Sequence, residues 1–295
     1  MIKKSKGERI FSVFNVVILG ILALVCAYPM VYVLFASFSD PMKLMAHAGF
    51  LFKPLGFSVE AYKTVLTNPE LYTGYANTLL YVAAGAVLNM IMTLLGGFCL
   101  SRKNLLWKNT IMFIFAFTMY FGGGLIPTYL IVESLGLVNT RWSMIIIGCV
   151  STYNMIIMRT AIYGIPDSIE EAAQIDGAGH LTVLWKVVAP LCKPTIAVLA
   201  LFYIFSKWND WFNPMIYLRD RSMYPLQTFL RELLIINDTT NVADEAALRD
   251  TANLNMSKYV IQYCTIIVST APVLCIYPFL QKYFASGVMV GAVKG

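Results

Sequence analysis

A cluster of polar and aromatic side chains interrupts an otherwise apolar stretch of the chain. Its members are Lys207, Trp208, Asn209, Asp210, Trp211 and Asn213. These groups suit sugars, because tryptophan stacks on apolar ring faces and amides and acids exchange hydrogen bonds with hydroxyls. Two alternatives stay open: tryptophan also anchors helices at membrane interfaces, and Lys207 and Asp210, three apart on one helix face, can neutralise each other.

Six further polar residues in apolar stretches are weaker candidates for a solute pathway: Asn77, Tyr81, Asn89, Ser151, Tyr153 and Asn154. A membrane enzyme would need histidines, serines or paired carboxylates at membrane depth, and Asp210 alone qualifies. The six cysteines show no C-x-x-C spacing and the two histidines are isolated, so no metal site or disulfide framework is predicted. The pattern G-x-x-x-x-G-K-[ST] is absent, so no nucleotide cofactor is expected on this chain.

A second informative stretch, residues 163–194, begins with signals for a short helix. Pro166 ends the element before it, and the S-x-x-E spacing of Ser168 and Glu171 predicts a capping box that opens a helix. Glu170 and Glu171 are expected in the first turn, where the helix dipole favours acids.

The same stretch continues with signals for a bend and a second helix. Gly177 and Gly179 allow a sharp turn, after which residues 181–188 restart a helix. The small side chains of Ala172 and Ala173 beside this turn predict a compact knob that can seat in a cleft of another protein. An amphipathic interfacial connector is the equally open alternative.

The elements that must position these residues are membrane-spanning helices. Of the 295 residues, 58% are hydrophobic and 13% charged, and the mean hydropathy is +0.68, whereas soluble domains carry about 25% charged residues. A helix needs about 20 apolar residues to cross the hydrocarbon core. Six stretches qualify, at about 12–36, 77–100, 110–132, 142–163, 193–217 and 259–281. The predicted fold is therefore all-α and transmembrane, with no room for a soluble catalytic domain.

Basic residues indicate the orientation. Residues 1–11 and 101–109 are rich in lysine and arginine, as cytoplasmic segments are, so both termini and the loop 164–190 are expected in the cytoplasm. The net charge of +6 then reflects topology, and nucleic-acid binding is not expected. Residues 12–284 form the predicted transmembrane domain and 285–295 a cytoplasmic tail. The first apolar run is too long for a signal peptide and is interpreted as a retained span.

Two long external loops, about 37–76 and 218–258, are each expected to contain a short helix. Ser58 can cap the first, and residues 243–250 form the second. They are either docking surfaces for a partner or solvated connectors. The three glycines after Phe121 predict a helix break or a close-packing site.

Residues 171–190 resemble the EAA motif of binding-protein-dependent ABC permeases, in which E-A-A is followed by three residues, G, nine residues and I-x-L-P. Glu171, Ala172 and Ala173 are followed at this spacing by Gly177 and then by V-V-A-P ending at Pro190, with Val for Ile and Ala for Leu. The resemblance covers nearly the whole chain, including KWNDWFNPMIYL and the ending YPFLQKYFASGVMVGAVKG. It is closest to sugar permeases similar to the smaller membrane subunit of the maltose importer. Residues 121–142 look like the LplC-like or YtcP-like branch, which is associated with complex oligosaccharides.

The resemblance implies a type I importer permease with six spans, in which the loop 164–190 forms cytoplasmic coupling helices. The coupling residues that it implies are Glu170, Glu171, Ala172, Ala173, Asp176, Gly177, Ala178, Gly179 and Pro190. It further implies a plasma-membrane complex with a second homologous permease in a heterodimer, two ATPase subunits that bind ATP and Mg, and an extracellular solute-binding protein. The partner permease can hold most of the sugar. The tail 285–295 either reaches between the ATPases or is a frayed end.

Two other kinds of transporter remain as alternatives. One is an ABC importer for a peptide, an amino acid or an ion. The other is a secondary transporter, which would usually show more spans and internal repeats than this sequence has.

Overall fold

The computed structural model describes residues 6–233 and 259–275. Within these ranges it contains helices, turns and an isolated bridge between Ser39 and Phe57, and no strand. The predicted all-α class is thus confirmed for the described residues. The chain divides into two compact units, residues 1–69 with 230–272 and residues 70–229 with 273–295.

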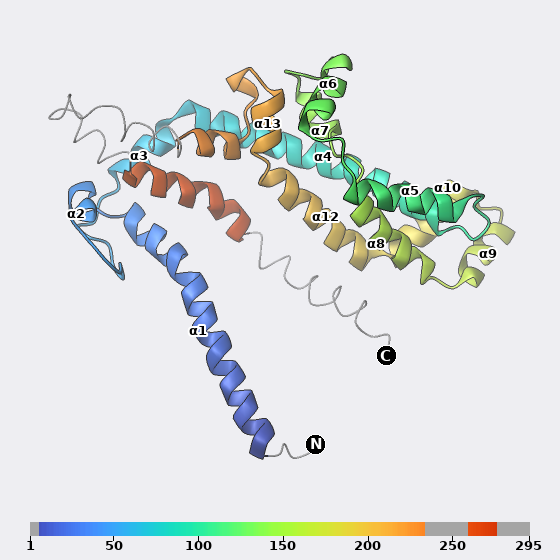
Figure 1. The fold of residues 1–295 in the computed structure, drawn as a ribbon, viewed down its shortest axis with the longest axis horizontal. Coiled ribbons are helices and arrows are strands. Elements are labelled where there is room, and N and C mark those ends of the chain that lie inside the picture. The colour runs from blue at the N-terminus through green and yellow to red at the C-terminus, as the bar shows by residue number, and fades with distance from the viewer. Residues whose placement is uncertain (1–5, 234–258, 276–295) are drawn as a thin grey trace. The chain divides into compact units, whose positions relative to one another are not determined.

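The first unit begins with α1, Lys6–Ser37, which matches the first predicted span and is long and apolar enough to cross a membrane. Most of its apolar side chains are exposed, and burial begins only at Ala36 and Ser37. The short helices α2, Pro41–Met45, and α3, Glu60–Thr67, follow (Figure 1). The expected helix after Ser58 is present, but its N-cap is Val59 and no side chain caps it, so the predicted Ser58 cap is wrong; the Glu60 N–H donates to the Ser58 hydroxyl at 3.4 Å.

An apolar helix at Tyr259–Cys275 belongs largely to the same unit and starts where the sixth span was predicted. The Cys264 thiol donates to the Ser37 carbonyl at 3.2 Å, and the rings of Tyr263 and Tyr32 meet edge to face. The rest of that predicted span, the predicted helix at 243–250 and the tail 285–295 lie outside the described residues.

The second unit is built on α4, Pro69–Ser101, which starts about two turns before the predicted second span. Its second half carries adjacent glycines where α8, Thr152–Tyr163, crosses it. A Cβ on Gly97 would lie 2.8 Å from the Met158 side chain and 3.1 Å from the Arg159 nitrogen. The two backbones therefore approach closely through small residues, as in other membrane helix pairs.

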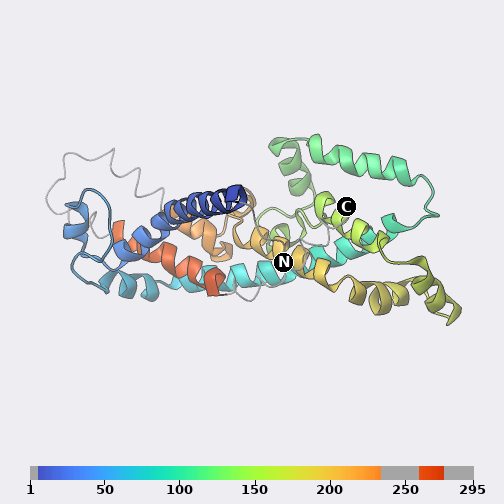
Figure 2. The ribbon, with the colours of Figure 1, turned by 90° about the horizontal axis from the view of Figure 1, so that it is seen from below.

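The third predicted span is two helices, α5 (Lys108–Tyr120) and α6 (Leu125–Ser134), which meet at 113° (Figure 2). The glycines at 122–124 occupy the break, so the expected helix break is confirmed. Gly124 has a φ of +85°, which the glycine backbone permits.

The fourth and fifth predicted spans are also divided. The fourth consists of α7 (Arg141–Ile146) and α8, separated at 147–151, and the fifth of α12 (Lys193–Trp208) and α13 (Phe212–Tyr217), separated at 209–211. Among the described helices, two are long and apolar enough to cross a membrane on their own, or up to four if each bent pair counts as one span, so six crossings stay a prediction.

Two apolar clusters hold the second unit together. One joins α4, α8, α12 and the loop between α8 and α12, and consists of Leu94, Phe98, Met158, Ile162, Val183, Leu184, Val188, Cys192 and Leu199. The other joins α4, α6, α7 and α13, and consists of Tyr81, Val132, Met144, Ile145, Tyr217 and Leu218. Each positions one of the candidate sites described next.

Candidate coupling loop and polar chamber

The loop between α8 and α12 begins with α9, Asp167–Ile175. The predicted capping box is wrong: the N-cap is Pro166, no side chain caps the helix, and Ser168 is already its second residue. Because Pro166 has an extended ψ of 132°, the helix starts immediately after it, two positions earlier than a Ser168 cap would require. The acids of the first turn are Asp167 and Glu170, and Glu171 follows them.

A left-handed glycine ends α9, as the sequence predicted. Gly177 has a φ of +85°, and its N–H donates to the Gln174 carbonyl at 2.9 Å. The Ala178 N–H donates to the Ala173 carbonyl at 2.9 Å, which closes the helix end. A Cβ at Gly177 would meet nothing within 4 Å, so the need for glycine comes from the backbone and leaves the surface open.

The second helix of the loop comprises α10 (His180–Thr182), the π-helical η1 (Val183–Val188) and α11 (Ala189–Leu191). It meets α12 at 88°. Val183, Leu184 and Val188 are fully buried in the cluster with Phe98 of α4 and Met158 of α8. The loop therefore shares a core with the ends of three longer helices and is not a loose connector.

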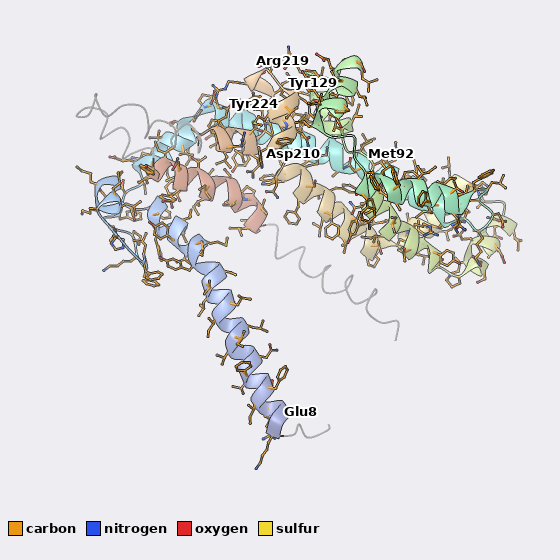
Figure 3. All side chains as sticks on the ribbon, in the orientation of Figure 1. Glu8, Met92, Tyr129, Asp210, Arg219 and Tyr224 are labelled. Carbon is orange, nitrogen blue, oxygen red and sulfur yellow. The ribbon has the colours of Figure 1, made fainter. Side chains whose placement is uncertain are left out.

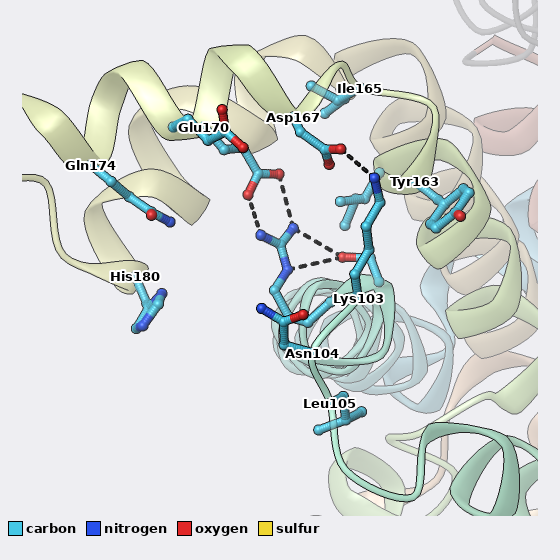
Figure 4. A pocket seen from close by; sticks show the side chains of 13 residues that line it. Lys103, Asn104, Leu105, Tyr163, Ile165, Asp167, Glu170, Gln174 and His180 are labelled. Atoms are coloured by element: carbon cyan, nitrogen blue, oxygen red, sulfur yellow. Dashed lines mark hydrogen bonds and ion pairs between the residues drawn. The ribbon is translucent and has the colours of Figure 1, made fainter.

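Two ion pairs fasten α9 to the segment that follows α4 (Figure 4). The Arg102 guanidinium donates to both oxygens of Glu170, one of them at 2.9 Å, and the Glu170 side chain is 12% exposed. Arg102 also donates to the Phe98 carbonyl at 3.2 Å and lies 4.1 Å above the Phe98 ring centroid. The second pair, Lys103 with Asp167, is well exposed, and its hydrogen bond raises the pKa of Lys103.

These residues surround a polar cavity of about 550 Å³ (Figure 4). The sequence analysis missed Arg102, Lys103 and Asp167 as site residues, because it used the two basic residues only for orientation. The sequence did contain a signal for these ion pairs. Basic residues follow the second predicted span, acidic residues begin the loop after the fourth, and both segments were predicted on the same side of the membrane.

The predicted coupling residues divide into an inner and an outer set. Glu170 points inward to Arg102, and Ala173 and Ala178 pack against the apolar cluster. The outer set is exposed to the surroundings of the loop and consists of Glu171, Ala172, Asp176, Gly177, Gly179 and Pro190. Ile175 is 86% exposed and Leu181 65%, so the turn presents small and apolar side chains outward.

The polar cluster of α12 is arranged differently from the prediction. α12 ends at Trp208, so Lys207 and Asp210 do not share a helix face. Lys207 donates to the carbonyls of Met144 at 2.7 Å and Ile147 at 3.2 Å, at the end of α7. Asp210, at the junction of α12 and α13 (Figure 3), accepts from the Asn213 N–H and side-chain amide at 3.1 and 2.8 Å. The predicted shared helix face is therefore wrong, and the described residues show no direct ion pair between Lys207 and Asp210, because broken helices expose carbonyls that attract the ammonium group.

A polar chamber of about 180 Å³ lies where these breaks meet α4. It brings together six of the residues predicted for a solute pathway: Asn89, Ser151, Asn154, Lys207, Asp210 and Asn213. Asn89 is 2% exposed, and its Oδ1 is the one buried side-chain polar atom in the described residues that has no hydrogen-bond partner. The chamber thus offers a buried acceptor to a donor that enters it.

The other predicted pathway residues lie elsewhere. Trp208 is buried, and the Asn209 amide donates to the Phe205 carbonyl. Trp211 packs edge to face on Phe212, and Tyr153 is exposed outside the chamber lining. Asn77 and Tyr81 hold the segment after α13 by donating to the carbonyls of Ser222, Tyr224 and Met223.

Comparison with known proteins places this arrangement among transport permeases. No family model matches the chain. It is 35% identical to Protein LplC of Bacillus subtilis over 99% of this chain and 97% of that protein. It is 34% identical to the polygalacturonan/rhamnogalacturonan transport system permease protein YtcP of Bacillus subtilis over 98% and 99%. A chain in the crystal structure of a bacterial ABC transporter involved in the import of the acidic polysaccharide alginate superposes with a TM-score of 0.85 and 34% identity, covering 96% of this chain and all of that one.

Proposed function

The chain belongs to the sugar permeases of ATP-binding-cassette importers, and we propose that it forms one membrane-spanning subunit of an importer that takes up an oligosaccharide delivered by an extracellular solute-binding protein. The observation that carries the proposal is the loop from α9 to α11. The Arg102–Glu170 ion pair holds this loop against the end of α4. At the turn, Gly177 has open space around it.

In this proposal the chain crosses the plasma membrane six times with both termini in the cytoplasm. The bent pair α5–α6 supports a span that is broken at the membrane rather than a straight rod. The basic residues at Arg102, Lys103 and Lys108 support a cytoplasmic position for the segment that holds α9.

α9 to α11 act as coupling helices that seat in one of two separate ATPase subunits, and a second, homologous permease seats its own coupling helices in the other. ATP and Mg bind to those ATPases, and no cofactor binds here. Glu171 is exposed and takes part in neither ion pair of the described residues, so it is placed to meet a basic residue of the ATPase. Nucleotide-driven movement of the ATPase then turns α9, and the Arg102–Glu170 pair carries that turn to α4.

The chamber is the part of the solute pathway contributed by this subunit. Asn89 supplies a buried acceptor and Lys207 a fixed ammonium group, which together suit sugar hydroxyls and carboxylates. The names of two relatives, which refer to polygalacturonan and to alginate, make uronate-containing oligosaccharides the first substrates to test. Lys207 also has a purely structural use at the end of α7, so the chamber assignment needs a direct test.

The test is uptake by the reconstituted complex of both permeases, the ATPases and the binding protein. Labelled neutral and acidic oligosaccharides are compared, with ATP or a non-hydrolysable analogue inside the vesicles. We expect ATP-dependent uptake of a sugar and none with the analogue. Uptake without ATP would exclude an ATP-driven importer, and ATP-dependent uptake of a peptide or an ion would exclude the sugar.

A further inference from the structure

The segment after α2 folds back beside α1 (Figure 1). It carries exposed aromatic rings. Phe50 and Phe52 are 72% and 71% exposed, and each ring contacts Tyr28 of α1, with centroids 5.2 and 5.9 Å apart. Leu51 between them is buried, and its N–H donates to the Tyr28 hydroxyl at 3.0 Å. The segment is therefore fixed beside α1 at the level of Tyr28 and not at the end of the helix.

Tyr28 lies within the apolar part of α1, which continues to Ala36, and a crossing that starts at Ile10 reaches the far side of the hydrocarbon core near Tyr28. Before Ile10 the helix carries charged residues such as Arg9. From Ile10 to Tyr28 the helix rises by about 27 Å. This length is close to the roughly 30 Å thickness of the hydrocarbon core. The apolar side chains of this part are mostly exposed, as lipid contact requires. Tyr28, Phe50 and Phe52 thus form an aromatic group at a membrane interface, where such rings gather.

A basic pocket of about 480 Å³ lies in the same segment. Lys43, His47 and Lys53 line it together with small or apolar residues, and no acidic residue does. Gly56 leaves room for one of these lysines: a Cβ there would lie 3.0 Å from the Lys43 ammonium nitrogen. Asp40 lies beside the pocket, with its Cβ 3.3 Å from the same point, and its Oδ1 accepts the backbone N–H groups of Met42 and Lys43 at the start of α2.

We propose that this pocket binds the phosphate of an anionic lipid headgroup. Phe50 and Phe52 lie at the boundary between headgroups and acyl chains, and lysine side chains can extend from that depth to the phosphate layer. A pocket with two lysines and no acid attracts a phosphate, whereas the neighbouring rings favour a ligand that also has an apolar part. The proposal requires only that α1 crosses the membrane, and it depends neither on the ATPase nor on the sugar.

The experiment measures lipid binding to the purified full complex in detergent. Phosphatidylglycerol and phosphatidylcholine are titrated separately, and bound lipid is counted by native mass spectrometry. We expect a preference for phosphatidylglycerol that falls about fivefold for each of Lys43→Gln and Lys53→Gln, and on the order of 30-fold when both are changed. Lys63→Gln is the matched control, because Lys63 is an exposed lysine of α3 outside the pocket.

Three results would overturn the proposal. The first is an unchanged preference in the double variant, and the second is an equal loss in the control. The third is complete displacement of phosphatidylglycerol by inorganic phosphate, which would assign the pocket to a soluble anion. If the double variant instead weakened capture of the solute-binding protein without affecting lipid binding, the pocket would be a protein-docking surface.

A second measurement tests the depth of the rings and does not depend on the lysines. Phe52→Trp is reconstituted in vesicles whose lipids carry bromine near the headgroup end of the acyl chain. We expect the added tryptophan to increase the quenched fraction of fluorescence above that of the parent protein. A quenched fraction no larger than in the parent would place the segment in water and contradict the site.

Discussion

Arg102 and Glu170, which are 68 positions apart, form a bidentate ion pair that joins the end of α4 to the first turn of α9. The guanidinium group is also held by the Phe98 carbonyl and ring, and the Arg159 side chain donates to the Leu100 carbonyl beside it. The planar fork of arginine fixes the orientation of the carboxylate as well as its distance. The ion pair therefore fixes the first turn of α9 to the end of α4.

Glu170→Gln is expected to uncouple ATP hydrolysis from uptake. The change leaves Arg102 without its counter-charge, which costs about 2–3 kcal/mol, somewhat less than for a fully buried pair because the Arg102 side chain is 29% exposed. We expect the variant to insert and assemble, with a lower ratio of sugar transported to ATP hydrolysed. The measurement is that ratio in proteoliposomes, together with the melting temperature in detergent.

Asp167→Asn is the matched control for this prediction. It removes the other ion pair of α9, but both side chains of that pair are 60% exposed, so water screens the pair and its loss should cost little stability. The exchanged double variant Arg102→Glu with Glu170→Arg should recover part of the coupling. Equal defects in Asp167→Asn and Glu170→Gln would contradict a special role for the buried pair.

Gly177→Ala is expected to weaken coupling through backbone strain alone. A residue with a Cβ loses roughly 1–2 kcal/mol at a left-handed φ such as the +85° found here. Since nothing lies within 4 Å of the added carbon, the strain shifts the turn between α9 and α10 without a clash. Gly177→Asn serves as the control, because asparagine adopts this conformation more readily, and the transport-to-hydrolysis ratio should rank glycine, then asparagine, then alanine. An alanine variant equal to the parent would show that the turn tolerates distortion.

The sequence predicted the coupling loop well because local signals dominate there. Pro166 sets the start of α9 and Gly177 its end, and both act through their own backbone preferences. Ser168 was wrongly predicted as the N-cap. The S-x-x-E pattern here begins at the second residue of a helix that starts directly after a proline. The partner of Glu170 was missed because the ion pair joins residues that are close only after α4 and α8 pack together.

Within the described residues, the apolar helical stretches were predicted in place but not in continuity. Apolar composition identifies the stretch 142–163, yet it does not reveal that Gly148, with a φ of +72°, ends one helix before another begins. The same holds at Asp210, which was placed on a helix face shared with Lys207. Polar residues that cap such breaks are hard to distinguish in sequence from residues that face a pathway.

The exposed pair of Lys103 and Asp167 is expected to be insensitive to pH near neutrality. Its hydrogen bond raises the pKa of Lys103 above 10.5, so its contribution is complete below that ordinary value and is lost only as the pH rises through the raised one. Lys103→His should move the effect to neutral pH, because histidine ordinarily titrates near about 6.5. The NMR titration of the introduced imidazole should give a pKa above that value, and Asp167→Asn should abolish the increase. An unshifted imidazole with Asp167 intact would show that the contact does not persist in solution.

Asn89→Leu is expected to separate transport from stability. The substitution removes the buried Oδ1 that has no partner in the described residues, so the protein should be unchanged or stabilised by about 1 kcal/mol. If the chamber carries the sugar, uptake should fall roughly three- to tenfold, the effect of one lost hydrogen bond. Asn77→Leu is the contrasting change on the same helix, since it leaves the carbonyls of Ser222 and Tyr224 unpaired and should lower the melting temperature. Thermal unfolding and ATP-driven uptake, measured on both variants, distinguish the two roles. Normal uptake by Asn89→Leu would remove the chamber from the solute pathway and leave Lys207 as the cation that caps the end of α7.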